Sequence, residues 1–221
     1  MKCFNLICII ALFLSLNSLC ENGLIGYWRF EEGKGNLVMD SSANGIKGVI
    51  TGAKWTKGLW GNALEFDGKG GVVINSPLLD GMSELTVALW LNIKEDRLFS
   101  PLAKKECIYR FIFSPDHFVV ATENNPWYSY GTVLPFKNAP RGKWFFLAGT
   151  YANGTLKVYL NGELVASQGG LSGNIKKSDG PLTLGLADAK EISNFLGKID
   201  ELRIYRRALS DEEIRSLYNS Y

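Results

Sequence analysis

The chain has 221 residues, of which 46% are hydrophobic and 21% are charged, and its formal net charge is +2 at pH 7. This length is sufficient for one domain with a substantial core. The near-zero charge gives no indication of a nucleic-acid-binding surface, so we expect no nucleic-acid partner.

Residues 1–20 are predicted to be a secretory signal peptide. Lys2 supplies a positive charge, Phe4–Leu16 form an apolar core, and the segment ends in small residues up to Cys20. The apolar core is shorter than the roughly 20 residues that span a bilayer, so no membrane span is expected after cleavage. Two alternatives stay open, namely an uncleaved membrane anchor and a lipid-modified Cys20.

Residues 21–221 are then predicted to form one domain. Removal of the signal peptide takes away one of the 24 basic residues and none of the 22 acidic ones, which leaves 23 minus 22, or +1. Three of the four cysteines lie in the predicted signal peptide, so Cys107 has no partner. The domain is therefore not a disulfide scaffold, although its predicted location is outside the cytoplasm.

Short runs of β-branched and aromatic residues, separated by Gly, Asn, Asp and Pro, dominate this domain, as is typical of a sandwich or barrel. In the clearest run, Leu85–Ile93, apolar residues alternate with others and define a core face. The other predicted strands outside the meander and C-terminal stretch are Leu24–Phe30, Ile46–Ile50, Ala63–Asp67, Val72–Ile74, Tyr109–Phe113, Phe118–Thr122, Tyr128–Val133 and Leu182–Leu186.

The strongest topological signal is a predicted three-stranded meander. Trp144–Ala152, Thr155–Leu160 and Glu163–Ser167 are separated by two Asn-Gly pairs, at Asn153 and Asn161. Asn-Gly favours a tight antiparallel hairpin because both residues tolerate positive φ. The first pair is also part of a glycosylation sequon, Asn-Gly-Thr.

The C-terminal stretch Phe195–Tyr221 is predicted to be a strand followed by a capped helix. The apolar phase of the strand changes across Asp200 and Glu201, which indicates a β-bulge. Ser210 and Glu213 match a capping box at the start of the helix. Asp200 lies between apolar neighbours, where a carboxylate is costly unless it has a partner.

Six segments, in this order, resemble the concanavalin A-like jelly rolls of the LamG-like group. They are LIGYWRFEEGKG, VMDSSANGIKG, LWGNALEFDGKGGVVI, ELTVALWLNI, KWFFLAGTYANGTLKVYLNGELV and GKIDELRIYRRALSDEEI. The resemblance covers Gly23–Tyr221. It implies an all-β fold, a two-sheet antiparallel jelly-roll sandwich with a short C-terminal helix.

The resemblance also implies a structural calcium ion (Ca2+). Carried over by position, its ligands are Asp40, Asn44 and Asp200, together with backbone carbonyls, in accord with the preference of calcium for six to eight oxygens. The alternative is that Asp40 caps a turn and Asp200 accepts backbone hydrogen bonds. Glu31 and Glu32 are further candidate ligands.

No catalytic residues are predicted. Glycoside hydrolases of laminarinase type on this fold carry two glutamates flanking an aspartate on one strand, and the nearest match, Lys198–Leu202, lacks the first glutamate. The only histidine, His117, excludes a zinc site with several imidazoles.

The predicted ligand-binding residues are Trp127, Tyr128 and Tyr130, in the proline-containing segment NNPWYSYGT. Aromatic rings beside amide side chains suit sugar rings. The alternative is that these rings pack against the sandwich. Trp28, Trp90 and Trp144 are expected in the core, whereas Trp55 and Trp60 are left open.

The sequence therefore predicts a secreted, non-catalytic binding module for a glycan or an extracellular protein, with a structural calcium ion. A diverged carbohydrate-active enzyme and a purely structural adhesion domain are the alternatives.

Overall fold

The structure is a computed structural model, and it describes residues 22–95, 100–105, 109–113, 117–124, 132–133, 140–187 and 194–221. These residues form two eight-stranded sheets, in which all strands pair antiparallel. The predicted all-β sandwich is confirmed.

Sheet A has the strand order β14-β13-β12-β7-β16-β5-β4, and β1 pairs with β16 beside this path. Sheet B has the order β11-β10-β9-β8-β15-β6-β3-β2. The strands of sheet A are β1 (Leu24–Trp28), β4 (Lys54–Lys57), β5 (Asn62–Asp67), β7 (Leu85–Ile93), β12 (Trp144–Ala152), β13 (Thr155–Leu160), β14 (Glu163–Gln168) and β16 (Leu196–Tyr205). The strands of sheet B are β2 (Leu37–Met39), β3 (Lys47–Ile50), β6 (Val72–Ile74), β8 (Ser100–Lys105), β9 (Tyr109–Phe113), β10 (His117–Val120), β11 (Thr132–Val133) and β15 (Leu182–Leu184).

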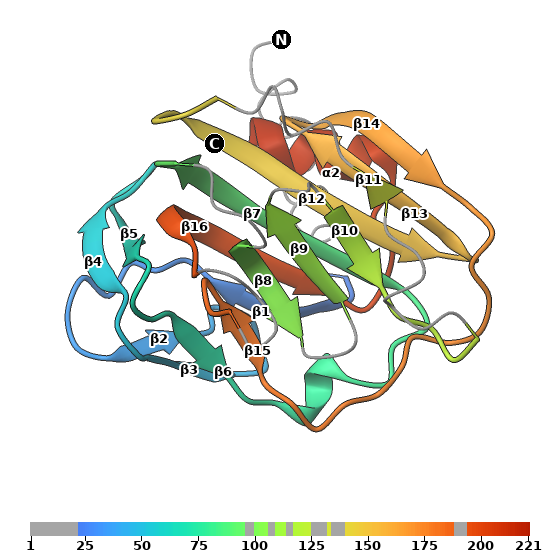
Figure 1. Ribbon diagram of the computed structural model, residues 1–221, viewed down its shortest axis with the longest axis horizontal. Coiled ribbons are helices and arrows are strands. Elements are labelled where there is room, and N and C mark those ends of the chain that lie inside the picture. The colour runs from blue at the N-terminus through green and yellow to red at the C-terminus, as the bar shows by residue number, and fades with distance from the viewer. Residues whose placement is uncertain are drawn as a thin grey trace, which may run out of the picture.

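The sheets stack face to face, with β8, β9 and β10 lying over the strands of sheet A (Figure 1). A large apolar core fills the space between the sheets and includes Leu89 and Leu91 of β7. A second apolar cluster covers the outer face of sheet A, where Trp90 of β7 and Phe146 of β12 pack beneath helix α2 (Asp211–Asn219). Because this sheet is covered on both faces along part of its area, β7 is almost continuously buried.

The predicted meander and its turns are confirmed. Strands β12, β13 and β14 are sequential neighbours in sheet A. Asn153 and Asn161 have φ values of 49° and 51°, as the two Asn-Gly turns require.

The last strand, β16, lies in the middle of sheet A. It pairs with β7 along one edge, and with β5 and then β1 along the other. The predicted bulge is also confirmed, because the register shifts between Asp200 and Arg203, and Glu201 has a φ of 55°. The extra residue places both Asp200, opposite Trp90, and Arg203, opposite Ala88, on the outer face of the sheet.

Helix α2 begins as the sequence predicts. The Ser210 side chain accepts a hydrogen bond from the Glu213 N–H, and the Glu213 side chain accepts one from the Ser210 N–H. Ile214 and Leu217 are buried against the outer face of sheet A. Packing of this apolar face stabilises a helix that is too short to be stable alone.

Several strand limits differ from the prediction. The first strand ends at Trp28 because Phe30 has a φ of 55°, and β15 ends at Leu184 because Gly185 has a φ of 71°. Three short strands that were not predicted, β2, β4 and β8, are present. A short 3-10 helix, η1, spans Pro77–Leu79. Along the described ranges, no helix has the length and apolar character needed to cross a membrane.

Candidate functional site

Asp40 ties the loop after β2 to strand β1. Its Oδ1 accepts hydrogen bonds from the backbone N–H groups of Tyr27 (2.8 Å) and Ser42 (2.7 Å). Its Oδ2 accepts from the Ser42 hydroxyl (2.6 Å) and the Ile46 N–H (3.0 Å). Two carboxylate oxygens offer about four acceptor positions, so these four bonds occupy the side chain.

Asn44 fastens the same loop. Its side-chain amide donates to the carbonyl oxygen of Ile25 at 2.8 Å and, at 3.4 Å, to that of Leu24. The amide nitrogen therefore faces the backbone of β1.

Asp200 binds a different segment. Its side chain is fully buried, and its Oδ2 accepts a hydrogen bond from the Leu59 N–H at 3.0 Å. Among the described residues, its Oδ1 has no hydrogen-bond partner. Burial first of all, and then the negative charges of Glu201 and Glu31, raise the pKa of Asp200 to about 8, against the lowering effect of the backbone N–H groups of Leu59 and Glu201.

The segment that Asp200 holds is the turn between β4 and β5. The N–H of Gly58 donates to the carbonyl oxygen of Gly61 at 3.1 Å and closes the turn. The carboxylate of Glu31 accepts from the Asn62 N–H at 3.2 Å on the other side. Trp60 lies in this turn with 55% of its surface exposed.

As they stand, the three predicted ligands do not form a calcium shell. Asp40 and Asn44 bind the backbone around β1, whereas Asp200 binds the turn at Leu59. No group of three or more His, Cys, Asp or Glu side chains in the described part of the chain could hold a metal ion. The hydrogen bonds correspond to the alternative role of Asp40, a turn cap, and calcium stays a prediction of the resemblance.

Next to Asp200, a group of charged and aromatic side chains surrounds Glu201, which is only 1% exposed. We call it the Glu201 cluster, and its other members are Tyr27, Arg29, Arg203 and Tyr221. The carboxylate accepts hydrogen bonds from the hydroxyls of Tyr27 and Tyr221. It also pairs with Arg203 (3.3 Å) and Arg29 (3.8 Å).

Aromatic contacts hold the cluster together. The guanidinium of Arg203 lies 3.8 Å from the centre of the Tyr27 ring, a cation–π geometry, and donates to the Tyr221 hydroxyl. Burial raises the pKa of Tyr27 and Tyr221, so both hydroxyls are protonated at neutral pH. Sequence reasoning missed this cluster, because Tyr27, Glu201 and Tyr221 meet only through folding.

A groove of about 600 Å³ opens beside the Glu201 cluster. Its floor is the outer face of β1 and β16, and its walls are the loop at Ser41–Ala43 and the C-terminal part of α2. Its lining combines hydroxyl, guanidinium and apolar groups: Leu24, Tyr27, Arg29, Ser41, Ser42, Ala43, Arg203, Tyr205, Leu217 and Ser220. A concave site with apolar walls and a few polar groups is the usual form of a small-ligand site.

The predicted binding residues Trp127, Tyr128 and Tyr130 lie outside the described residues, as do Cys107 and the predicted signal peptide at 1–20. Of the tryptophans expected in the core, Trp28 and Trp90 are buried. Trp144, in contrast, is only half-buried, and so is Trp55, one of the two that were left open.

The two adjacent acids of β16 do not form an accessible acid–base pair. Asp200 and Glu201 are both buried and hydrogen-bonded within the protein. A hydrolase of retaining or inverting type requires two carboxyl groups that flank a bound sugar. These two side chains therefore act within the fold.

Together, the stacked antiparallel sheets and the helix packed on sheet A define a jelly-roll domain with an open groove on one face. The sequence model of one family, described as the concanavalin A-like lectin/glucanases superfamily, matches residues 66–215. This match covers more than half of the chain, which therefore belongs to that family.

Solved structures support the same fold. One similar structure is domain 4 of AbnA, an extracellular GH43 arabinanase from Geobacillus stearothermophilus, solved in complex with arabinotriose. The chain superposes on it with a TM-score of 0.72 at 25% identity, and the match covers 88% of this chain and 98% of that domain. The binding domain of Paraclostridial mosquitocidal protein 1 gives a TM-score of 0.74 at 17% identity over 91% of this chain and 53% of that one, and this likeness concerns the fold alone.

A similar protein sequence is that of the rat (Rattus norvegicus) Sushi, von Willebrand factor type A, EGF and pentraxin domain-containing protein 1. The identity is 27% over an alignment of 173 residues, and the match covers 71% of this chain. The chain spans only about 5% of the length of that protein.

Proposed function

We propose that this protein is a non-catalytic, extracellular binding module whose ligand is a glycan or an extracellular protein. The groove beside the Glu201 cluster carries the proposal, because it combines a volume of about 600 Å³ with a mixed lining of hydroxyl and apolar groups and an exposed guanidinium. Sites of this size and lining suit a small oligosaccharide or one anchoring side chain of a partner.

The predicted signal peptide and the family membership support an extracellular location. A glycan is the first ligand class to test, because the similar AbnA domain was solved with arabinotriose. The predicted aromatic residues Trp127, Tyr128 and Tyr130 would add a second contact surface. The predicted calcium ion is a separate hypothesis, and the groove does not depend on it.

The test is binding of the purified protein to an immobilised glycan panel that includes arabinan, with a pair of matched arginine variants. Arg29→Ala removes a groove side chain that is 52% exposed, and Arg215→Ala removes one that is 51% exposed on α2. We expect Arg29→Ala to weaken binding and Arg215→Ala to leave it unchanged. Equal effects of the two variants would contradict the groove as the site.

Trp127→Ala tests the aromatic segment in the same assay, and loss of retention is the expected result. The enzyme alternative has a separate readout. Release of reducing ends from a polysaccharide panel by the purified protein would contradict a non-catalytic role, and we expect none. Failure to retain any glycan would favour a protein partner or a purely structural adhesion role.

A further inference from the structure

A second surface lies at the opposite end of β16 from the groove, on the same outer face of sheet A. Four residues form one cross-strand row there: Glu65 of β5, Lys198 of β16, Asn92 of β7 and Trp144 of β12. Glu65 pairs with Lys198, Lys198 with Asn92, and Asn92 with Trp144. We call these four residues the platform row.

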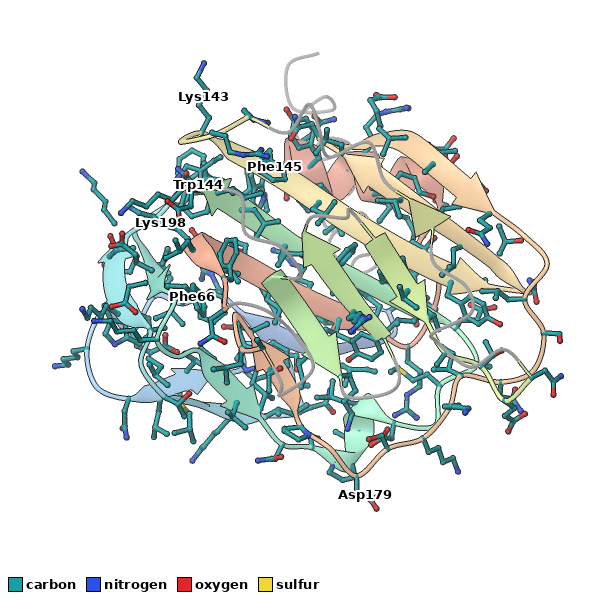
Figure 2. All side chains as sticks on the ribbon, viewed as in Figure 1. Phe66, Lys143, Trp144, Phe145, Asp179 and Lys198 are labelled. Atoms are coloured by element: carbon teal, nitrogen blue, oxygen red, sulfur yellow. The ribbon has the colours of Figure 1, made fainter. Side chains whose placement is uncertain are left out.

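Strand alternation places the whole row on the outer face. The strand neighbours of Glu65, Asn92 and Lys198 include Leu64, Leu91 and Ile199, which belong to the core between the sheets. Trp144 packs at the edge of the outer cluster beneath α2. Figure 2 shows Trp144 and Lys198 close together at this end of the sheet.

The row is partly exposed, and the contacts of its polar groups can be followed among the described residues. All four side chains are partly exposed. Within the described ranges, Glu65, Asn92 and Lys198 make no side-chain hydrogen bond or ion pair, although Glu65 and Lys198 face each other on adjacent strands. A carboxylate, an ammonium group and an amide thus stand in line, with acceptors and donors available to a ligand.

The dimensions suit a chain-like ligand. Adjacent strands are about 4.8 Å apart, so four strands space these side chains over roughly 14 Å. At one end, the indole of Trp144 offers a flat apolar surface of the kind that stacks against the C–H face of a sugar ring. The other three residues would meet ring hydroxyl groups.

Charge indicates which sugars fit. The opposite charges of Glu65 and Lys198 cancel within the row. Beyond β5, Lys54 of the edge strand β4 pairs with Asp67 at 3.3 Å, so that neighbouring pair is balanced as well. The carboxylate of Glu65 would repel an acidic sugar next to it, whereas a neutral chain meets no such penalty there.

We propose that the platform row binds a neutral oligosaccharide that lies across the strands of sheet A, with one sugar ring stacked on Trp144. This inference rests on the proposed function in its glycan-binding form and assigns that form a site apart from the groove.

The experiment measures binding of the purified protein to neutral polysaccharides, linear arabinan and laminarin, and to one acidic polysaccharide, chondroitin sulfate. We expect the wild type to bind a neutral polysaccharide. Trp144→Ala and Asn92→Ala should each bind it at least about tenfold more weakly, because they remove the aromatic side chain that anchors the ligand and its polar neighbour. Trp60→Ala is the matched control, because it removes an exposed indole outside the row, in the turn held by Asp200. This variant should bind the polysaccharide as the wild type does.

A thermal melt of each variant separates lost binding from lost folding. If Trp144→Ala unfolds, Asn92→Ala and Lys198→Met carry the test. Unchanged binding by the row variants, while the wild type binds a neutral glycan, would overturn the platform row and leave the proposed function standing. Binding of the acidic polysaccharide alone would also overturn the row. No binding of any glycan would remove the glycan-binding function and the row together.

Discussion

Replacing Asp200 with asparagine should change how the stability of this protein depends on pH. In the folded protein, burial raises the pKa of this carboxyl from 3.8 to about 8. Between these values the folded protein keeps the proton, whereas the unfolded chain releases it. Unfolding therefore releases a proton, and the free energy of unfolding falls as pH rises from about 4 to about 8.

The size of the effect follows from the shift. At about 1.4 kcal/mol per pKa unit, a shift of roughly four units sets an upper limit near 6 kcal/mol. We expect about half of that, ~3 kcal/mol, because water that reaches an ionised side chain reduces the penalty. The amide oxygen of Asp200→Asn can still accept the Leu59 N–H. The variant should match the wild type near pH 4.5 and exceed its stability by about 3 kcal/mol near pH 8.5.

Urea unfolding of both proteins from pH 4.5 to pH 9 measures this difference. The control is Asp67→Asn, which alters an exposed carboxyl whose pKa is lowered, first of all by its hydrogen bond from Lys54. That variant should follow the wild-type profile across the whole range above pH 5. Parallel profiles for Asp200→Asn and the wild type would refute the reasoning, since Asp200 would then be ionised in the folded protein.

Three further predictions concern the same region. Gly58→Ala should destabilise the protein by at least ~2 kcal/mol in chemical denaturation, because the added Cβ would lie 2.4 Å from the backbone oxygen of Asn62 and 2.6 Å from the Asp200 carboxylate. The control is Gly169→Ala, which should have little effect because its Cβ would meet nothing nearer than 3.8 Å. Glu201→Ala should reduce the free energy of unfolding by about 3–5 kcal/mol, because the buried charge of Arg203 would lose its carboxylate partner. A double-mutant cycle of Glu201 and Arg203 measures this coupling, and it would be contradicted if the losses of the two single variants simply added in the double variant. If the predicted calcium ion is bound, chelation with EDTA should lower the thermal midpoint, and added calcium should restore it. An unchanged midpoint would contradict the ion and leave Asp40 as a turn cap held by its four hydrogen bonds.

Local chemistry explains which parts of the fold the sequence predicts well. The Asn-Gly turns, the capping box at Ser210 and the bulge at Glu201 each depend on residues within a few positions of one another. The short strands β2 and β4 were missed because three or four residues give too little alternation to identify a strand.

The candidate site was predicted only in part, because its contacts are distant in sequence. The sequence identified Asp200 as a buried acid that needs a partner, but its partner, the Leu59 N–H, lies 141 positions away. Tyr27 and Glu201 are 174 positions apart, and nothing local links them. Only the register of β1 against β16 brings them together. The one local signal is the phase change at Glu201, which marks the bulge and not its purpose.

The central position of β16 has a consequence for how the protein is made. This strand enters sheet A between β7 and the pair β5 and β1, so it supplies the middle of the sheet from residues 196–205. Ribosomes add about 5–20 residues per second, and strands that pair over long sequence separations form slowly. Strands β1, β5 and β7 must therefore remain without their common partner until the final strand has been synthesised. Sheet A can therefore close only after β16 has been synthesised.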